Sequence, residues 1–79
     1  MAMVDVSKMK REDKERNAIH DSVDATYTVF EKNGGRYFQI DTYGRSSRDI
    51  PGKLSQTIQF DKKSALKLIE LLAKAFSDD

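Results

Sequence analysis

Cysteine is absent from this 79-residue chain, and His20 is its only histidine. Without cysteine, no disulfide can stabilise the fold. One histidine cannot supply the four nitrogen and sulfur ligands of a structural zinc site. A cysteine-free chain fits a reducing compartment. We therefore expect no metal and no other cofactor.

Long apolar stretches are also absent. No segment approaches the ~20 apolar residues that a membrane-spanning helix requires. Residues 1–10 lack the apolar core of a signal peptide,. The sequence therefore predicts a cytoplasmic protein that does not enter a membrane.

Neither sign of charge is in large excess, since 14 basic and 13 acidic residues leave a formal net charge of +1. Overall charge therefore neither favours nor excludes an anionic partner. A mild basic excess lies in the middle of the chain, where four basic residues stand against two acidic ones: Arg36, Arg45, Arg48 and Lys53 against Asp41 and Asp49.

The small size of the chain limits its core. A chain of 79 residues forms one domain,, and such a domain buries only roughly 60% of its unfolded surface. Small domains usually gain stability from disulfides, a metal or self-association. Since the first two are not expected here, the sequence predicts a homodimer.

No group of residues points to catalysis. A general base needs a neighbouring partner and a pocket, and His20 lies in a polar segment that suggests neither. Ser46 and Ser47 lack an activating base, and Asp41 and Asp49 are too isolated to form a carboxylate pair. The sequence therefore predicts that the protein is not an enzyme.

Two segments rich in β-branched and aromatic residues, 25–30 and 36–43, predict a β-hairpin,. Between them, Asn33-Gly34 suits the two positive-φ positions of a type I′ turn. In the resulting register, paired residue numbers sum to 67. One face of the hairpin then carries the pairs Val29–Phe38 and Tyr27–Ile40, and the other carries Phe30–Tyr37, Thr28–Gln39 and Thr26–Asp41.

The remainder of the chain predicts a third strand and a helix. Residues 54–60 alternate in strand fashion, Asp61 suits a helix N-cap, and residues 62–76 carry a wide apolar stripe at helical spacing,. Residues 1–22 form a polar N-terminal arm, mobile or loosely helical, and residues 23–79 a single β-β-β-α domain. We therefore expect an α+β fold with a three- to four-stranded antiparallel sheet and a C-terminal amphipathic helix.

The hairpin face opposite the predicted core carries aromatic rings beside polar side chains. Exposed rings on a sheet can stack on nucleobases, worth ~1–3 kcal/mol per base, and nearby basic side chains can contact phosphates. The predicted nucleic-acid-binding residues are Phe30, Arg36, Tyr37, Gln39, Tyr43, Arg45, Arg48 and Lys53. The alternative is that Phe30 and Tyr37 form a stabilising cross-strand pair, covered by the arm or by a second subunit.

Two of these segments resemble the positive cofactor four family of transcriptional coactivators. Residues 52–61, Gly-Lys-Leu-Ser-Gln-Thr-Ile-Gln-Phe-Asp, followed by Lys-Lys-Ser-Ala-Leu-Lys-Leu, are similar to that family's last strand and helix entry. Residues 36–40, Arg-Tyr-Phe-Gln-Ile, are similar to an inner strand. The resemblance spans about residues 25–76.

The resemblance implies a homodimer joined through the helices and a curved four-stranded sheet that binds single-stranded DNA. It implies DNA contacts at Arg36, Tyr37 and Lys53, with Arg45 and Arg48 as loop contacts. Only three strands are evident in the sequence, so a fourth would have to come from residues 3–6 or 17–24.

These observations predict a protein that binds single-stranded DNA or RNA with little sequence preference, as a transcription- or replication-associated regulator. The alternative is a small protein-interaction module or inhibitor that binds a protein partner through the exposed sheet face.

Overall fold

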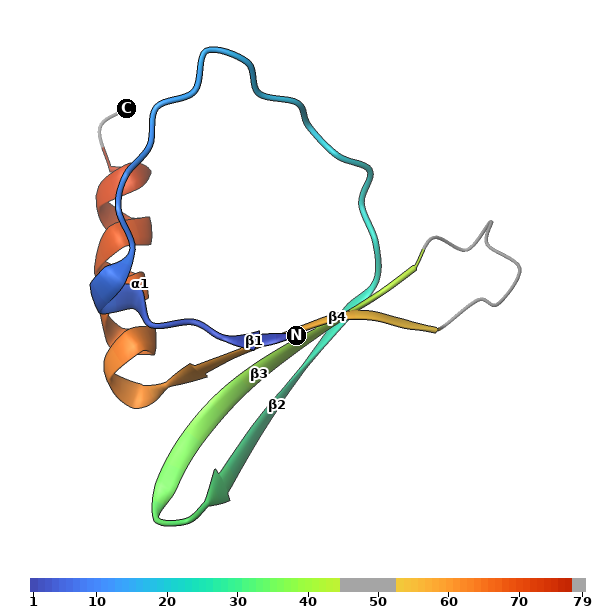
Figure 1. The fold of residues 1–79 in the computed structure, drawn as a ribbon, viewed down its shortest axis with the longest axis vertical. Helices are drawn as coiled ribbons and strands as arrows, with labels where there is room; N and C mark the ends of the chain where they lie inside the picture. Colours follow the sequence, from blue (N-terminus) through green and yellow to red (C-terminus); the bar gives the residue numbers. More distant parts are fainter. Residues whose placement is uncertain (45–52, 78–79) are drawn as a thin grey trace.

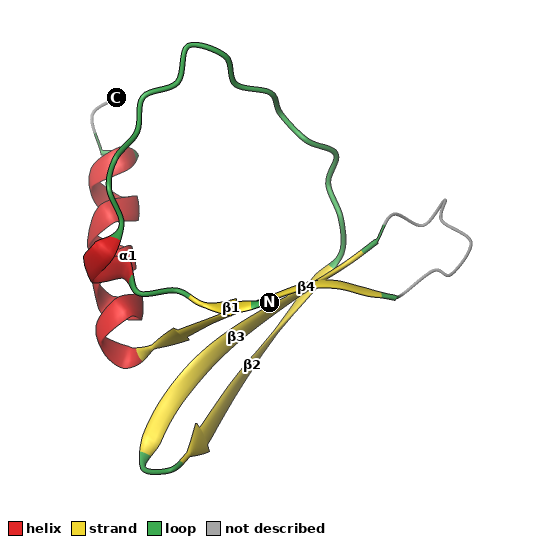
Figure 2. Ribbon diagram, viewed as in Figure 1, coloured by secondary structure: helices red, strands yellow, loops and turns green. Residues whose placement is uncertain are grey.

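The computed structural model describes residues 1–44 and 53–77. It has the α+β fold that the sequence predicts, in which a four-stranded sheet is followed by a C-terminal helix (Figures 1 and 2). The elements are β1 (Ala2–Met3), the 3₁₀ helix η1 (Val6–Lys8), β2 (Ala25–Lys32), β3 (Gly35–Tyr43), β4 (Leu54–Asp61) and α1 (Lys62–Ala75). The strands lie in the order β1-β4-β3-β2.

The β2–β3 hairpin has the predicted register. Tyr27 pairs with Ile40 and Phe30 with Tyr37. Asn33 and Gly34 take φ values of 53° and 80°, which the type I′ turn requires and which disfavour most other residues. Because this turn sets the pairing of both strands, it also decides which side chains share a face.

The fourth strand is β1, and it changes the sheet from antiparallel to mixed. β1 pairs in parallel with β4, with Ala2 opposite Ile58 and Met3 opposite Gln59. The sequence predicts an antiparallel sheet, which the β2–β3 and β3–β4 pairs form. Of the two segments considered for a fourth strand, residues 17–24 form none, and residues 3–6 overlap β1 only at Met3. A two-residue strand is too short for an alternation pattern to reveal.

The N-terminal segment is attached to the helix at one point. The backbone N–H of Val6 donates a hydrogen bond of 3.1 Å to Ser64 Oγ, and the Val6 side chain is only 2% exposed. Within the described chain, residues 9–24 contain neither helix nor strand. They arch from η1 back to the start of β2 (Figure 1).

Helix α1 begins where the sequence predicts. Asp61 Oδ1 accepts a hydrogen bond of 2.8 Å from the backbone N–H of Ser64, which satisfies one of the free donors of the first turn. The last helical residue is Ala75, and the backbone N–H of Phe76 donates to the carbonyl oxygen of Leu72. This helix is not long and apolar enough to cross a membrane, and no other described helix is either.

The interior of a single copy is very small. Among the described residues, only Val6, Phe60 and Ser64 are buried. The Cα radius of gyration is 15.1 Å, against about 12 Å for a compact domain of this length. A single copy therefore leaves much of its apolar surface in contact with water.

Candidate nucleic-acid interface

Alternation along β2, β3 and β4 gives the sheet two chemically different faces. Residues paired in register share a face, so the observed pairs define both. We call one the polar face; it carries Thr26, Thr28, Phe30, Lys32, Tyr37, Gln39, Asp41, Thr57 and Gln59. We call the other the apolar face; it carries Tyr27, Val29, Phe38, Ile40, Ile58 and Phe60.

An aromatic pair lies on the polar face beside the hairpin turn. The ring centroids of Phe30 and Tyr37 are 5.6 Å apart, with the planes tilted by 30°, a favourable arrangement for two rings. Both residues are partly exposed. The Tyr37 ring leans over Gly35, since a Cβ added at Gly35 would lie 2.7 Å from Tyr37 Oη. The absence of a side chain at Gly35 therefore allows this ring position.

Four polar side chains form a hydrogen-bonded row across the middle of the same face. Thr57 Oγ1 donates to Asp41 Oδ1 at 2.6 Å, and Gln39 Nε2 donates to Asp41 Oδ2 at 3.0 Å. Gln59 Nε2 in turn donates to Gln39 Oε1 at 2.7 Å. The hydrogen bonds from Thr57 and then Gln39 lower the pKa of Asp41 below its ordinary value, so this carboxylate is charged at neutral pH,.

A shallow cavity of about 380 Å³, which we call the hairpin pocket, lies between the aromatic pair and this polar row. This volume is at the lower end of the range of about 300–1,000 Å³ for ligand pockets. The residues that line it come from all four strands and the hairpin turn: Met3, Phe30, Lys32, Asn33, Tyr37 and Gln59. The cavity therefore combines rings, an amide and an ammonium group.

Tyr43 lies at the end of the polar face that is farther from the hairpin turn. Its hydroxyl lies 3.0 Å from Thr26 Oγ1, and the backbone N–H of Gly44 donates to the carbonyl oxygen of Lys53. The side chain of Lys53 is exposed. Tyr43 and Lys53 thus stand at the end of the sheet opposite the hairpin pocket.

The basic residues predicted to bind phosphate do not gather beside the aromatic pair. Arg36 pairs with Glu31 in register, and by alternation its side chain lies on the apolar side of the hairpin rather than beside Tyr37. Arg45 and Arg48 lie outside the described residues. Sequence reasoning did not select Lys32, although strand alternation from Phe30 places it on the polar face, and it did not identify Met3, whose strand left no pattern.

The apolar face is exposed along β2. The rings of Tyr27 and Phe38 stack with centroids 5.3 Å apart, yet Tyr27 is 70% exposed and its neighbour Val29 is 49% exposed. Apolar residues of α1 and its C-cap are exposed in the same way: Leu66, Ile69, Leu72 and Phe76. Both surfaces therefore present large apolar side chains to water.

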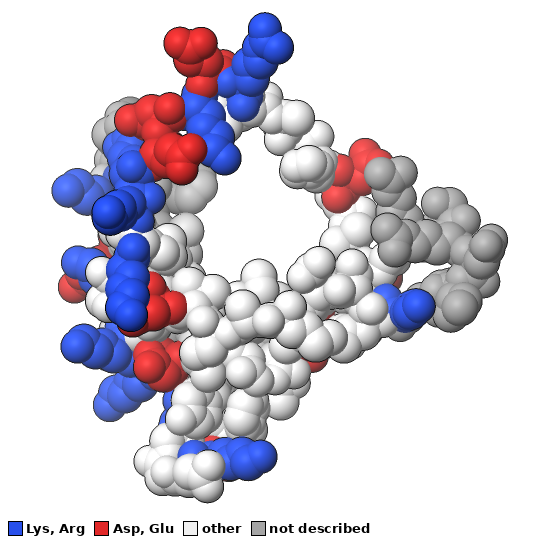
Figure 3. Space-filling view, in the orientation of Figure 1, with Lys and Arg blue, Asp and Glu red and all other residues white. Residues whose placement is uncertain are grey.

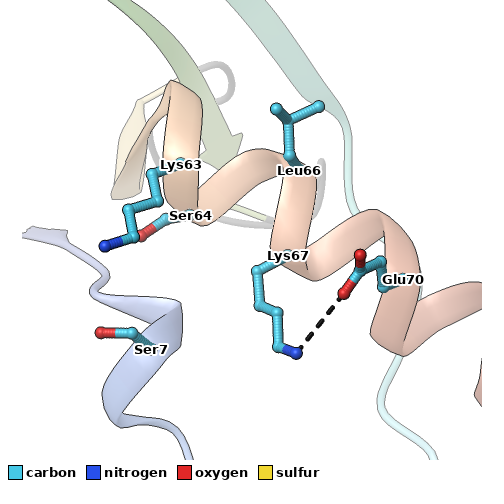
Figure 4. A pocket seen from close by; sticks show the side chains of 6 residues that line it. All are labelled: Ser7, Lys63, Ser64, Leu66, Lys67 and Glu70. Atoms are coloured by element: carbon cyan, nitrogen blue, oxygen red, sulfur yellow. Dashed lines mark hydrogen bonds and ion pairs between the residues drawn. The ribbon is translucent and has the colours of Figure 1, made fainter.

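A second cavity lies where η1 meets α1 (Figure 4). Ser7 comes from η1, and the other lining residues come from α1: Lys63, Ser64, Leu66, Lys67 and Glu70. Lys67 Nζ lies 3.4 Å from Glu70 Oε2, so one of the two lysines already has an acidic partner. Within the described chain, no three His, Cys, Asp or Glu side chains are grouped so that they could hold a metal ion.

No family model matches the chain, and no curated protein or solved structure matches it either. The resemblance to the positive cofactor four family therefore stays a prediction from the sequence.

Proposed function

We propose that the chain binds single-stranded nucleic acid on its polar face, with little overall sequence preference, as a cytoplasmic homodimer associated with transcription or replication. The observation that carries this proposal is the Phe30–Tyr37 ring pair beside a row of hydrogen-bonded amide and hydroxyl groups on one sheet face. Rings offer stacking surfaces that accept any base, and amides offer donors and acceptors to base edges.

The charges on this face favour one orientation of a bound strand. The carboxylate of Asp41 lies in the middle of the face and repels phosphates, whereas Lys32 and Lys53 stand at its two ends. Phosphates would therefore pass over the ends and edges of the sheet, and the bases would turn towards its centre. Because few cations contact the backbone, we expect a moderate dependence of affinity on salt.

A second copy of the chain is the partner that we propose for the exposed apolar surface. The exposed apolar residues of the sheet and of α1 are too numerous for a stable monomer of this size,. Figure 3 shows an opening between the arm, α1 and the sheet whose rim is mostly uncharged, while charged side chains gather on the outer side of the helix and on the arm. A second copy packed against α1 and the apolar face would cover these residues and leave the polar face free.

Titration of a labelled mixed-sequence oligonucleotide at two salt concentrations tests the proposal. Tyr37→Ala should weaken binding by about 5- to 150-fold, which corresponds to ~1–3 kcal/mol of stacking. Tyr37→Phe is the matched control, because it keeps the ring and should bind as the wild type does. Lys53→Gln should weaken binding of every sequence alike and reduce the salt slope by about 1. Absence of binding at low salt would exclude this function.

The alternative function is a protein-interaction module, and the exposure of Tyr27 and Val29 on the apolar face favours it. In that case a different protein, rather than a second copy, would cover the apolar face. Sedimentation of the purified chain distinguishes the two, because a chain that needs a foreign partner would stay monomeric at high concentration. A monomer that binds no oligonucleotide would support the interaction module.

A further inference from the structure

We propose that two copies of the chain join through the free edge of β2, with the two β2 strands paired antiparallel about a two-fold axis at Thr28. This inference rests on the homodimer of the proposed function and states how its two copies meet. It is carried by an open strand edge of eight residues and by the opposite charges that one register of this edge brings together.

The outer side of β2 is open. The strand order β1-β4-β3-β2 places β2 at one edge of the sheet, and among the described elements only β3 contacts it. Every residue of β2 except Phe30 is exposed, whereas β3 is mostly half-buried. Residues 25–30 contain no charged side chain and no proline, two devices that commonly stop an edge strand from pairing with another chain. A second strand therefore fits this edge.

The ladder between β2 and β3 shows which backbone groups of β2 are free. In an antiparallel pair, alternate residues turn their N–H and C=O groups towards the partner strand. The carbonyl oxygen of Asp24 accepts from the backbone N–H of Tyr43 at 2.9 Å, so even-numbered residues on this strand face β3. The backbone groups that point to the free edge, where no described strand pairs with them, belong to the odd-numbered residues: Ala25, Tyr27, Val29 and Glu31.

This pattern restricts how two β2 edges can pair. Outward-facing residues meet one another, and like faces lie on the same side, only when the two-fold axis lies at a residue rather than between two residues. With the axis at Thr28, this residue lies opposite its own copy, and Tyr27 lies opposite Val29 of the second copy. An aromatic ring opposite a β-branched side chain is a favourable cross-strand pair.

Charge complementarity selects the register centred on Thr28. This register places Asp24 opposite Lys32 of the second copy, and the two-fold axis forms the pair twice. Both residues are exposed, and no described residue forms an ion pair with either of them. Moving the axis to either neighbouring residue shifts the register by two positions and leaves both charges opposite uncharged residues.

The joined sheet keeps its two faces separate. Because the axis is perpendicular to the sheet, both polar faces lie on one side and both apolar faces lie on the other. Tyr27 and Val29, which are exposed in a single copy, then lie at the centre of the joined sheet rather than at its edge. The pairing therefore shields part of the apolar surface and lets the polar face continue from one copy into the next.

Cysteine cross-linking of the full chain tests this arrangement, because the chain has no cysteine of its own. Thr28→Cys places the Cα atoms of the two cysteines about 4.5 Å apart, within the range of a disulfide. Mild oxidation should convert most of this variant into a covalent dimer. Thr26→Cys is the matched control on the same face, but it lies roughly 14 Å from its copy along the strands. It should give at least about tenfold less covalent dimer.

Charge reversal tests the register. Asp24→Lys alone and Lys32→Glu alone each place like charges opposite one another twice, and each should raise the dissociation constant of the dimer about tenfold. A mixture of these two variants should recover the wild-type constant, because both cross-strand pairs of a mixed dimer then join opposite charges. Lys74→Glu, the same reversal on α1, is the control and should leave the constant unchanged. Analytical ultracentrifugation measures all four samples.

The outcomes separate this inference from the proposed function. A dimer in which Thr28→Cys cross-links no better than Thr26→Cys would overturn the pairing through β2. Charge variants whose mixture dimerises no better than either alone would overturn the register. Cross-linking at Thr28 in a chain that binds no oligonucleotide would confirm the pairing and overturn the proposed binding of nucleic acid.

Discussion

In a stable monomer, the apolar face of a sheet is covered and the polar face is open to water. Here the side chains of the polar face contact one another, whereas apolar side chains on the other face are exposed. On the polar face, Asp41 accepts hydrogen bonds from two neighbours, and the Phe30–Tyr37 rings lie against each other. On the apolar face, Tyr27 is 70% exposed and Val29 is 49% exposed. The side chains of the polar face are hydrogen-bonded or stacked on one another, whereas the β2 part of the apolar face is left open to water.

This contrast separates two roles that a small sheet can have. A face whose polar groups already bond to one another loses few hydrogen bonds when a flat ligand displaces the water on it. Such a face suits reversible binding. A face of exposed apolar side chains gains about 25 cal/mol for each Å² that it buries, so it suits permanent association. We infer that the apolar face builds the dimer and that the polar face meets the ligand.

Ile69→Glu should have the largest effect, because it places a charge in the proposed dimer interface. Ile69 is 60% exposed in a single copy, so a monomer would tolerate the change. A dimer would bury an unpaired carboxylate and lose more than about 3 kcal/mol. Analytical ultracentrifugation and thermal unfolding should show a monomer with a much lower Tm.

Lys74→Gln is the control for Ile69→Glu, since it changes the net charge by the same amount at an exposed position of α1. It should leave both mass and Tm unchanged. The wild-type Tm should also rise with protein concentration, as mass action requires of a dimer. A wild type that sediments as a monomer, with a Tm independent of concentration, would contradict the assignment of the apolar face.

Ser64→Ala should have the next largest effect, because Ser64 connects the N-terminal segment to α1. The substitution leaves the buried N–H of Val6 without its acceptor, which costs ~1–3 kcal/mol. Since the same segment carries Met3 into the hairpin pocket, binding of oligonucleotides should weaken slightly as well. Hydrogen exchange at the Val6 amide should become faster.

Ser7→Ala serves as the comparison for Ser64→Ala. Ser7 also lines the groove between η1 and α1, but its hydroxyl bonds only to Asp5, at 2.6 Å on the surface. This variant should lose far less stability and keep the Val6 amide protected. Equal effects of the two substitutions would show that the buried hydrogen bond does not hold the segment in place.

The sheet and helix were predictable because local signals determine them. Asn33-Gly34 specifies the hairpin register, and Asp61 marks the start of α1. Two features of the polar face were not predictable. Met3 reaches it through a parallel pair only two residues long, and the Asp41–Gln39–Gln59 row depends on which amide atom faces which neighbour, which no spacing in the sequence encodes.

Two neighbouring glycines, Gly34 in the turn and Gly35 at the start of β3, allow the role of the Tyr37 ring to be separated from the stability of the hairpin. Gly35→Ala adds a Cβ that would lie 2.7 Å from Tyr37 Oη, so the ring must move. Gly35 does not have a positive φ, so the backbone accepts alanine and gains up to about 1 kcal/mol. This gain roughly offsets the loss of the Phe30–Tyr37 ring contact, worth about 0.5–1.5 kcal/mol, so overall stability should change little. Oligonucleotide affinity should nevertheless fall a few-fold.

Gly34→Ala should lower stability and leave oligonucleotide affinity unchanged, the reverse of Gly35→Ala. Its φ of 80° strains an alanine, at a cost of about 1 kcal/mol, while nothing lies within 4 Å of the added Cβ. Stability should therefore fall, and affinity of the folded protein should not change. If both variants lost affinity in proportion to stability, the ring position would have no separate role in binding.

Thr57→Val should have the smallest effect, which appears in the pH dependence of stability. Thr57 is the main cause of the lowered pKa of Asp41. A lowered folded-state pKa adds stability above the ordinary value of 3.8, and that stability is lost as the pH falls through the folded value. Thr57→Val should thus lower the Tm near neutral pH, and its difference from the wild type should narrow below pH 3.8.

Thr28→Val is the matched control for Thr57→Val, because Thr28 lies on the same face and its hydroxyl bonds to no other described residue. Any change in its Tm should be independent of pH, since no carboxylate depends on it. If the Thr57→Val difference also stayed constant through the acid range, Asp41 would not be held as a hydrogen-bonded carboxylate. The direction of the hydrogen bonds from Gln39 to Asp41 and from Gln59 to Gln39 would then lose its support.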